Sequence, residues 1–208
     1  MAGLGGGAVS LRISGGRRLL SPPGTVARPT AARVRLAVMN LLADRLAGCH
    51  WLDLCCGSGV MACEALQRGA DRVVAVERDR RVAAVARANL EAVARGLQPE
   101  GSGAGGPRFE VHGAEVQGWL DPGPAARCLD PFDLIYLDPP WPAGLHRPIS
   151  EAVAAGGWLA PGGLLVWECP SEALAAIPDG WVSRPPRRYG GSTVLLLEQE
   201  GQPVALQG

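Results

Sequence analysis

The chain has 208 residues, enough for one domain of ordinary size, and 47% of them are hydrophobic, so a proper core can form. Its 20 basic residues, all of them Arg, balance 20 acidic residues, which excludes a chain that is basic or acidic throughout. The total conceals an uneven split, because residues 1–43 hold six Arg and no acid, whereas the remainder holds 14 Arg and 20 acids. The charge therefore predicts a basic N-terminal segment on an acidic body.

The cysteines and histidines do not form a metal-binding pattern. No C-x-x-C pair occurs among the six cysteines, and the three histidines are too scattered to complete a ligand cluster, so we expect no metal. The sequence has no secretory signal and no apolar run long enough to span a membrane. We therefore expect a cytoplasmic protein with free thiols and no membrane association.

The N-terminal part predicts a small hairpin and one helix. Residues 1–8 are rich in Gly and are expected to be disordered. Val9–Leu20 alternates apolar residues with Arg around Gly15-Gly16, which is typical of a hairpin. After a stretch rich in Pro and Gly, Thr30 is the expected N-cap of a helix. The apolar stripe of this helix is Val34, Val38, Leu41, Leu42 and Leu46. Residues 9–47 thus form a basic extension.

Residues 48–200 alternate predicted strands with predicted helices. The strands are expected at Trp51–Leu54, Arg72–Val76, Arg108–His112, Phe132–Leu137, Leu164–Glu168 and Val194–Glu198. The helices are expected at Val60–Gln67, Arg80–Arg95, Ile149–Ala155 and Ser171–Ala176. This alternation is typical of an α/β domain in which helices cover both faces of a parallel sheet. Gly96–Pro107 is expected to be a mobile loop, and residues 201–208 a tail.

The first strand of this domain runs into a glycine turn with the sequence LDLCCGSG, from Leu52 to Gly59. Ligands of open α/β sheets bind beyond the carboxyl ends of the strands, and Gly57 and Gly59 let the backbone approach such a ligand. The second strand ends at Glu77, where an acid often binds ribose hydroxyls. Taken singly, Glu77 is equally well explained as a solvated acid and Asp53 as the partner of an Arg. Their joint placement favours an adenosine-type ligand.

The fourth strand ends abruptly in Asp138-Pro139-Pro140-Trp141. Two consecutive prolines fix φ and remove two backbone donors, so the segment is rigid and its carbonyls stay free. A tryptophan packed beside a proline turn is a common structural feature on its own. Here the segment follows a nucleoside-type site at the same edge of the sheet, where a second reactant would meet the first.

These four residues suit a planar ring that carries an exocyclic amine. The Asp138 carboxylate can accept one N–H, the Pro139 carbonyl can accept the other, and Trp141 can stack on the ring. An amine conjugated to a purine is a poor nucleophile because its lone pair is delocalised. Two acceptors outside the ring plane favour a tetrahedral nitrogen and offset its developing positive charge. Proximity to an activated methyl group supplies further acceleration.

Together the two sites resemble the class I S-adenosylmethionine-dependent methyltransferases, in the subgroup that methylates exocyclic amines of nucleobases through a D/N/S-P-P-aromatic motif. The N-terminal part is similar to the RsmD family, which methylates guanine N2 in 16S ribosomal RNA. The R-P-T-x-x-R-V-R-E-x-x-F-N signature of that family matches Arg28-Pro29-Thr30, Arg33-Val34-Arg35 and Met39-Asn40. Its upstream hairpin matches Arg12-Ile13-Ser14-Gly15, and its Tyr-Gly-x-Thr pattern matches Tyr189-Gly190 with Thr193 one residue late. The resemblance covers residues 11–198.

The chain departs from the family pattern at four places. The Glu that usually follows the last Arg of the signature is Leu36 here, so any ion pair of that Glu is lost. Cys55-Cys56 replace Phe-Ala in the glycine turn, a conservative change for small buried thiols. The hairpin lacks the usual Trp-Arg-Gly spacing, which bears on its RNA contacts. The acid after the third strand, where it would meet an adenine amine, is Glu115 rather than Asp.

The resemblance implies a Rossmann-like class I methyltransferase with a mostly parallel, seven-stranded sheet, a reversed last strand, helices on both faces and a short hairpin and helix in front. It implies S-adenosyl-L-methionine as cofactor, bound by Asp53, Cys55, Gly57, Ser58, Gly59, Glu77, Arg78 and Glu115. The catalytic residues around a flipped guanine would be Asp138, Pro139, Pro140 and Trp141.

The resemblance also implies an RNA partner. The arginines of the extension can bind phosphates through bidentate, salt-dependent hydrogen bonds. The expected RNA-binding residues are Arg12, Arg17, Arg18, Arg28, Thr30, Arg33, Arg35 and Tyr189. The expected partner is 16S rRNA in a partly assembled small ribosomal subunit, with the protein acting as a monomer.

Three other functions fit parts of the sequence. An adenine-N6 DNA methyltransferase, or another nucleic-acid exocyclic-amine methyltransferase, shares the Pro-Pro-aromatic logic, but DNA enzymes generally need a sizeable target-recognition segment. A small-molecule methyltransferase leaves the acid-free, arginine-rich arm without a purpose. A non-enzymatic RNA-binding module has little need of both Glu77 and Asp138 at strand ends. Methyl transfer to guanine N2 of rRNA is the hypothesis that uses all these features.

Overall fold

The computed structural model describes residues 11–22, 29–97, 108–172, 174 and 176–201. The expectations of disorder over 1–8, of a tail over 201–208 and of a mobile loop over 96–107 therefore fall wholly or mostly outside the described residues. The same holds for the first two residues of the hairpin and for the predicted RNA contact Arg28.

A mixed sheet of eight strands forms the centre of the described part of the chain. Neighbouring strands follow the order β3-β2-β1-β4-β5-β8-β6, and β7 pairs with β8 outside this path. The strands are β1 (His50–Leu54), β2 (Arg72–Glu77), β3 (Arg108–Gly113), β4 (Phe132–Leu137), β5 (Leu159–Pro170), β6 (Trp181–Ser183), β7 (Arg187–Tyr189) and β8 (Ser192–Gln199). The first five strands are parallel, and β8 runs antiparallel to β5. The predicted Rossmann-like arrangement with a reversed last strand is confirmed.

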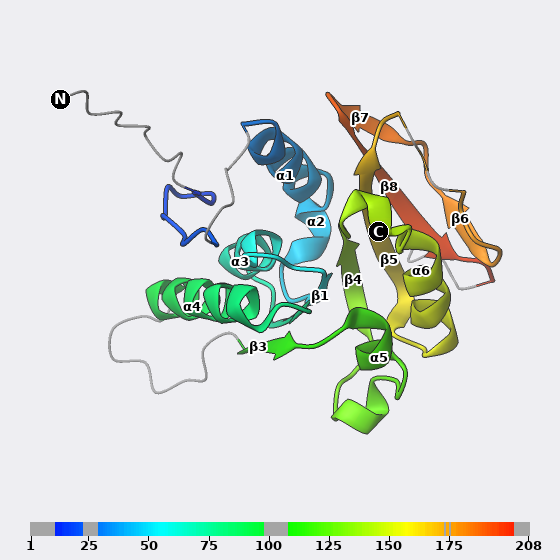
Figure 1. The fold of residues 1–208 in the computed structure, drawn as a ribbon, viewed down its shortest axis with the longest axis horizontal. Coiled ribbons are helices and arrows are strands. Elements are labelled where there is room, and N and C mark those ends of the chain that lie inside the picture. Colours follow the sequence, from blue (N-terminus) through cyan, green and yellow to red (C-terminus); the bar gives the residue numbers. More distant parts are fainter. Residues whose placement is uncertain (1–10, 23–28, 98–107, 173, 175, 202–208) are drawn as a thin grey trace.

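Helices cover both faces of this sheet (Figure 1). One face carries α1 (Pro29–Leu41), α2 (Ala43–Leu46), α3 (Val60–Gln67) and α4 (Arg80–Leu97), and the other carries α5 (Val116–Leu120) and α6 (His146–Ala155). Each face has its own apolar cluster, so alternate residues of the central strands are buried on opposite sides. In β4, Leu134 and Tyr136 face α1, α3 and α4, whereas Ile135 and Leu137 face α5 and α6.

The strand count is where the fold differs from the expected one: eight strands are described rather than seven. The extra strand arises because β6 and β7 both pair with β8, at opposite ends of it. Each has only three residues, too few for an alternating pattern to be visible in the sequence. Pairing with the long, buried β8 holds them in extended form.

The predicted helices agree with α3, α4 and α6 to within a few residues. The helix predicted over Ser171–Ala176 is wrong, because the described residues of that stretch form a turn and irregular backbone. The N-terminal helix, whose expected apolar stripe runs to Leu46, is divided into α1 and α2, and the short helix α5 was not predicted. Two 3₁₀ turns, η1 (Ala125–Arg127) and η2 (Trp141–Ala143), complete the described elements.

The hairpin is confirmed over its described residues, from Leu11 onward. Arg12 and Arg18 form an antiparallel bridge, and both Gly15 and Gly16 have φ of +81° at the turn. The helix that follows begins at Pro29, so Thr30 lies inside α1 and is not its N-cap.

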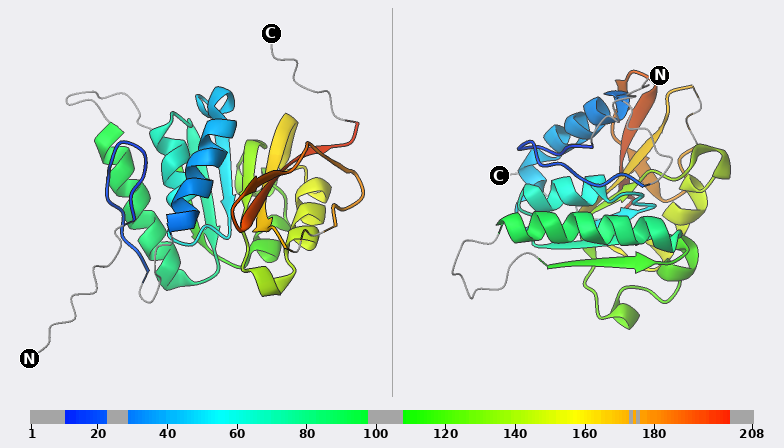
Figure 2. Two further views of the ribbon diagram at one scale, coloured as in Figure 1. Left: turned by 90° about the horizontal axis from the view of Figure 1, so that it is seen from above. Right: turned by 60° about the vertical axis from the view of Figure 1, so that its left-hand side comes forward.

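The hairpin and α1 lie against the layer formed by α3 and α4 (Figure 2). Two buried polar side chains, Glu64 and Asn89, bind them there. Glu64 of α3, 2% exposed, accepts a hydrogen bond from the backbone N–H of Ser14 at 3.0 Å and one from Arg35 Nε at 3.1 Å. Asn89 of α4, 1% exposed, accepts the N–H of Leu20 at 2.8 Å and donates to its carbonyl at 3.0 Å. Apolar residues of the hairpin and of α1 share the same core cluster.

No helix within the described ranges is both long and apolar enough to cross a membrane.

Candidate functional site

The glycine turn after β1 has the backbone that the sequence predicts. Gly59 has φ of +73°, and a Cβ there would lie 3.0 Å from Cβ of Ala86, so α3 and α4 can pack at this distance only with glycine. Gly57 has φ of +53°, but a Cβ there would meet nothing within 4 Å, which leaves room for a ligand. Cys55 also has a left-handed φ of 63°, a conformation that costs a non-glycine residue about 1 kcal/mol.

Asp53 is buried beneath this turn and is only 1% exposed. Its Oδ2 accepts the backbone N–H of Ala62 at 3.0 Å, so it caps α3 in place of Gly59, which has no side chain for that purpose. Burial raises the pKa of Asp53 to about 8 against the opposing effect of the Ala62 N–H, and the charges of Asp138 and Glu77 raise it further. Asp53 is paired with no Arg among the described residues and is not open to a ligand. It instead stabilises the glycine turn through its hydrogen bond to the backbone N–H of Ala62.

Glu77 joins the end of β2 to the glycine turn. Its Oε2 accepts the N–H of Gly57 at 3.0 Å, and its Oε1 accepts the N–H of Asp79 at 2.9 Å. The carboxylate is therefore held in one orientation beside the turn, where each oxygen still has a second lone pair for a hydroxyl group. The neighbouring Arg78 is exposed, and the backbone carbonyl of Ser58 accepts a hydrogen bond from Asn89 Nδ2 at 2.9 Å.

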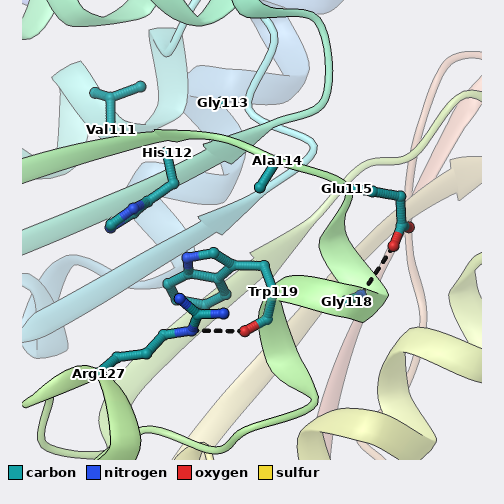
Figure 3. Close-up of a pocket in the computed structure, with 8 residues that line it drawn as sticks. All are labelled: Val111, His112, Gly113, Ala114, Glu115, Gly118, Trp119 and Arg127. Atoms are coloured by element: carbon teal, nitrogen blue, oxygen red, sulfur yellow. Dashed lines mark hydrogen bonds between the residues drawn. The ribbon is translucent and has the colours of Figure 1, made fainter.

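Glu115 is exposed at the next strand end, where it caps α5 by accepting the N–H of Gly118 at 2.9 Å. It lies at one end of a pocket of about 450 Å³ between β3, α5 and η1 (Figure 3). The ring of Trp119 is flanked there by His112, with ring centroids 5.3 Å apart, and by the Arg127 guanidinium at 4.8 Å. The lining residues are Val111, His112, Gly113, Ala114, Glu115, Gly118, Trp119 and Arg127. Through Glu115 the pocket adjoins the predicted cofactor residues, but it does not reach Asp138.

The segment Asp138-Pro139-Pro140-Trp141 follows β4 in the middle of the same edge. Pro139 is buried, and Pro140 has φ of −52° and ψ of 122°, which turns the chain into η2. Trp141 is 43% exposed, unusual for so large an apolar side chain, and is thus available to a ligand. Because the order of the sheet reverses between β1 and β4, this segment lies beside the glycine turn at the switch point, where α/β sheets bind ligands.

Asp138 has an open side toward solvent and is enclosed by protein on its other sides. Removal from water raises its pKa to about 7, and the negative charge of Glu168 adds to the rise. Glu168 lies at the carboxyl end of β5 and accepts the hydroxyl hydrogen of Tyr136 with an O···O distance of 2.5 Å. Neither Tyr136 nor Glu168 was singled out in the sequence, although both lie in predicted strands and Glu168 ends an apolar run.

The site is therefore rich in acidic side chains at adjacent strand ends: Asp53, Glu77, Asp138 and Glu168. Asp53, whose pKa is raised to about 8, is largely neutral at pH 7 and adds little to the negative charge. The thiols of the site are held protonated, since burial, followed by the charges of Glu77 and Asp53, raises the pKa of Cys55 to about 12. Burial likewise holds the pKa of Cys56 well above its ordinary value. Such a site favours a cationic ligand. The described residues contain no group of three or more His, Cys, Asp or Glu side chains placed to hold a metal ion.

The predicted RNA-binding arginines divide into two groups. Arg18 and Arg33 are exposed, as is Arg12, whose Nη1 donates to the carbonyl of Gly16 at 2.7 Å. Arg35, in contrast, is paired with buried Glu64 and its side chain is 11% exposed. Arg17 donates to the carbonyl of Ala92 in α4 at 3.1 Å.

We therefore correct the prediction for Arg35 and Arg17, because their guanidinium groups are used in internal contacts. Of the other two residues predicted to bind RNA, Tyr189 of β7 is half-buried against the core on the α1 side. Thr30 lies in α1, and its side chain is outside the described part of the structure.

Comparisons with known proteins agree with this geometry. The sequence model of a family described as "Conserved hypothetical protein 95" matches residues 11–198. The "Ribosomal RNA small subunit methyltransferase D" of Escherichia coli (strain K12) is 29% identical over 201 residues, which are 94% of this chain and 93% of the relative. These matches confirm the resemblance to the RsmD family.

Solved structures show the same fold. The candidate methyltransferase yhhF from Escherichia coli superposes with a TM-score of 0.71 at 27% identity, over 90% of this chain and 94% of that one. SMU.776, a candidate methyltransferase described as complexed with SAH, gives a TM-score of 0.59 at 15% identity over 82% of this chain and 50% of that one. The second likeness concerns the fold alone.

Proposed function

Because the chain belongs to the protein family described as Conserved hypothetical protein 95, we propose that it transfers a methyl group from S-adenosyl-L-methionine to the exocyclic N2 amine of a guanine in 16S rRNA. The observation that carries this proposal is the position of Asp138-Pro139-Pro140-Trp141 beside the glycine turn at the switch point of the sheet. The E. coli relative named for methylation of small-subunit ribosomal RNA supports the choice of substrate. The substrate form would be a partly assembled small subunit, and the protein would act as a monomer without a metal.

The residues around the glycine turn fit S-adenosyl-L-methionine. The open space above Gly57 accommodates a ligand close to the backbone, and the Glu77 carboxylate is oriented beside it for ribose hydroxyls. The carboxylates at the strand ends favour its positively charged sulfur. Bound there, the cofactor supplies a methyl carbon with a good leaving group.

Asp138 and the two prolines would prepare the amine for attack. The ionised Asp138 carboxylate accepts one N–H and the Pro139 carbonyl accepts the other, which draws the nitrogen lone pair out of conjugation with the ring. Trp141, exposed at the rim, stacks on the base and fixes its plane. The base must leave its helix or stack to reach these groups.

A methylation assay with three substrates tests the assignment: naked 16S rRNA, isolated small ribosomal subunits and duplex DNA, each with digestion and identification of the methylated nucleoside. We expect N2-methylguanosine from an RNA substrate, with the subunits methylated faster than naked RNA. N6-methyladenine in the DNA would support an adenine-N6 DNA methyltransferase instead, and no methylation of any of the three would overturn the proposal.

The exposed arginines of the hairpin and α1 are the proposed RNA surface. Replacing both Arg18 and Arg33 with Ala should weaken RNA binding about tenfold. The slope of the logarithm of the binding constant against the logarithm of the salt concentration should become shallower by about two, because each phosphate contact contributes about one. Affinity for S-adenosyl-L-methionine should not change. Fluorescence anisotropy over a range of salt concentrations measures both quantities.

Arg147→Ala is the matched control, because Arg147 is an exposed arginine on the opposite face of the sheet. Equal RNA affinity for the double variant and for this control would contradict the assignment of the surface.

A further inference from the structure

Two carboxylates end neighbouring strands at the candidate site. The pairing of β4 with β5 is parallel, and its last pair is Leu137 with Trp167, so Asp138 and Glu168 come next in register. Side chains alternate along each strand, and Tyr136, Asp138 and Glu168 therefore lie on the same side of the sheet. The 2.5 Å hydrogen bond between Tyr136 and Glu168 agrees with this placement.

Glu168 is held rigidly on both its side chain and its backbone. The Tyr136 hydroxyl donates to its Oε2, and the ring of Tyr136, itself 3% exposed, stacks on Trp51 with centroids 6.0 Å apart. Its backbone carbonyl lies 2.8 Å from Nε2 of buried His146 in α6. The Glu168 carboxylate is therefore fixed in one orientation at the strand end next to that of Asp138.

The titratable groups that face this pair do not cancel its charge. Tyr136 is neutral, because burial and then the charges of Glu168 and Asp138 hold its pKa well above the ordinary value. His146 is neutral as well, because burial lowers its pKa despite the Glu168 carbonyl. Burial raises the pKa of Cys169 to about 11 and that of Asp53 on β1 to about 8, so both groups are largely neutral at pH 7. Asp138 therefore faces an uncompensated negative neighbour.

We propose that Glu168, fixed by the hydroxyl of Tyr136, is a positioning residue whose negative charge prepares Asp138 to take the proton that the exocyclic amine loses. This inference rests on the proposed methyl transfer. The amine nitrogen gives its electron pair to the methyl carbon, and the carbon–sulfur pair leaves with sulfur. One N–H bond of the resulting cation then breaks, its electron pair returns to nitrogen, and the proton moves to an oxygen of ionised Asp138. Asp138 releases this proton through its open side to solvent.

An aspartate without such a neighbour would be a poorer acceptor. General-base catalysis works best when the pKa of the base lies near the working pH. Burial and Glu168 together raise the pKa of Asp138 to about 7, so it is a stronger base than ordinary aspartate yet is largely ionised slightly above neutral pH. Since ionised Asp138 is the active form, activity should rise as pH increases through about 7.

The test compares Glu168→Gln and Glu168→Asp with the wild type, in kcat measured from pH 5.5 to 9 with saturating RNA and cofactor. Gln keeps an acceptor for Tyr136 but removes the charge. The rising limb, meaning the part of the pH profile in which kcat increases with pH, should therefore shift to lower pH by roughly half to one unit, the effect of one nearby charge. The plateau should fall because Asp138 is then a weaker base. Asp keeps the charge, and its rising limb should stay near that of the wild type. KM for RNA should be unchanged in both variants.

A second readout does not require turnover. The ¹³C carboxyl resonance of Asp138, identified by its loss in Asp138→Asn, should titrate at lower pH in Glu168→Gln than in wild type without cofactor. Glu151→Gln, in an exposed pair with Arg147 on α6, is the control and should shift neither profile. If Glu168→Gln shifts neither the rising limb of the kcat profile nor the titration of the Asp138 resonance, the inference is overturned, even if N2-methylguanosine is formed. Absence of that product in wild type would overturn the proposed function, whereas the resonance would still decide whether the two carboxylates interact.

Discussion

Replacing Asp138 with Ala should lower kcat on the RNA substrate about 10³-fold, or about 4 kcal/mol in activation free energy. The variant loses the acceptor for one amine hydrogen, the charge that offsets the developing positive nitrogen, and the acceptor of its proton. The dissociation constant for S-adenosyl-L-methionine should change less than about threefold, because the turn at Gly57 and the Glu77 carboxylate are untouched. Single-turnover methylation and calorimetric titration of the cofactor measure the two quantities.

Asp138→Asn separates the functions that Ala removes together. Asn keeps an acceptor oxygen but cannot take a proton, so activity should lie between that of wild type and Ala, and the rising limb near pH 7 should disappear. Asp130→Ala, which removes an exposed aspartate shortly before β4, is the control and should behave as wild type. Full activity in Asp138→Ala, or an unchanged rising limb in Asp138→Asn, would show that Asp138 does not have the proposed role.

Replacing Glu64 with Ala should destabilise the fold by about 3–5 kcal/mol, the usual result of removing one partner of a buried ion pair. The change leaves the Ser14 N–H and the Arg35 guanidinium without their acceptor. It also removes the charge 3.7 Å from Arg68 Nε. For a chain of this size the unfolding midpoint should fall by roughly 10 °C. Denaturant and thermal unfolding followed by tryptophan fluorescence measure the loss.

Two further variants show whether the ion pair itself is responsible. Glu64→Ala combined with Arg35→Ala should cost less than the sum of the single variants, because the second change removes the unpaired guanidinium. Glu151→Ala in the exposed pair with Arg147 should leave stability unchanged. If Glu64→Ala were no more destabilising than Glu151→Ala, the anchoring of the N-terminal part by Glu64 would be refuted.

The sequence predicts those parts of the fold that are long, apolar and local. The β1, β2 and β4 strands were found within one residue of their ends, because each is a continuous apolar run buried on both faces. The β6 and β7 strands were missed because three residues carry no period of their own and depend on pairing with β8. Conversely, Ser171–Ala176 has a helical composition, but the chain turns after β5 to form the antiparallel pair with β8.

The sequence predicts those residues of the candidate site that belong to a local motif. It does not predict residues whose role depends on a partner that is distant in the sequence. Asp138 and the glycine turn follow strands directly and could be recognised from that position. Arg35 looked like part of a basic surface because its partner, Glu64, lies 29 residues away on another helix. Glu168 likewise gains its significance only from the pairing of β5 with β4, which brings it beside Asp138.

The side chain of Asn89 connects the N-terminal extension to the α/β domain. Its amide joins the last part of the hairpin, at Leu20, to the glycine turn, at the carbonyl of Ser58. The charge divides the chain into a short basic part and a longer acidic part near residue 43, but hydrogen bonds and packing join the described residues of both parts into a single body. Removing the hairpin would therefore leave the Asn89 side chain without its partners at Leu20, and the disturbance would reach the glycine turn through the bond from Asn89 to the carbonyl of Ser58.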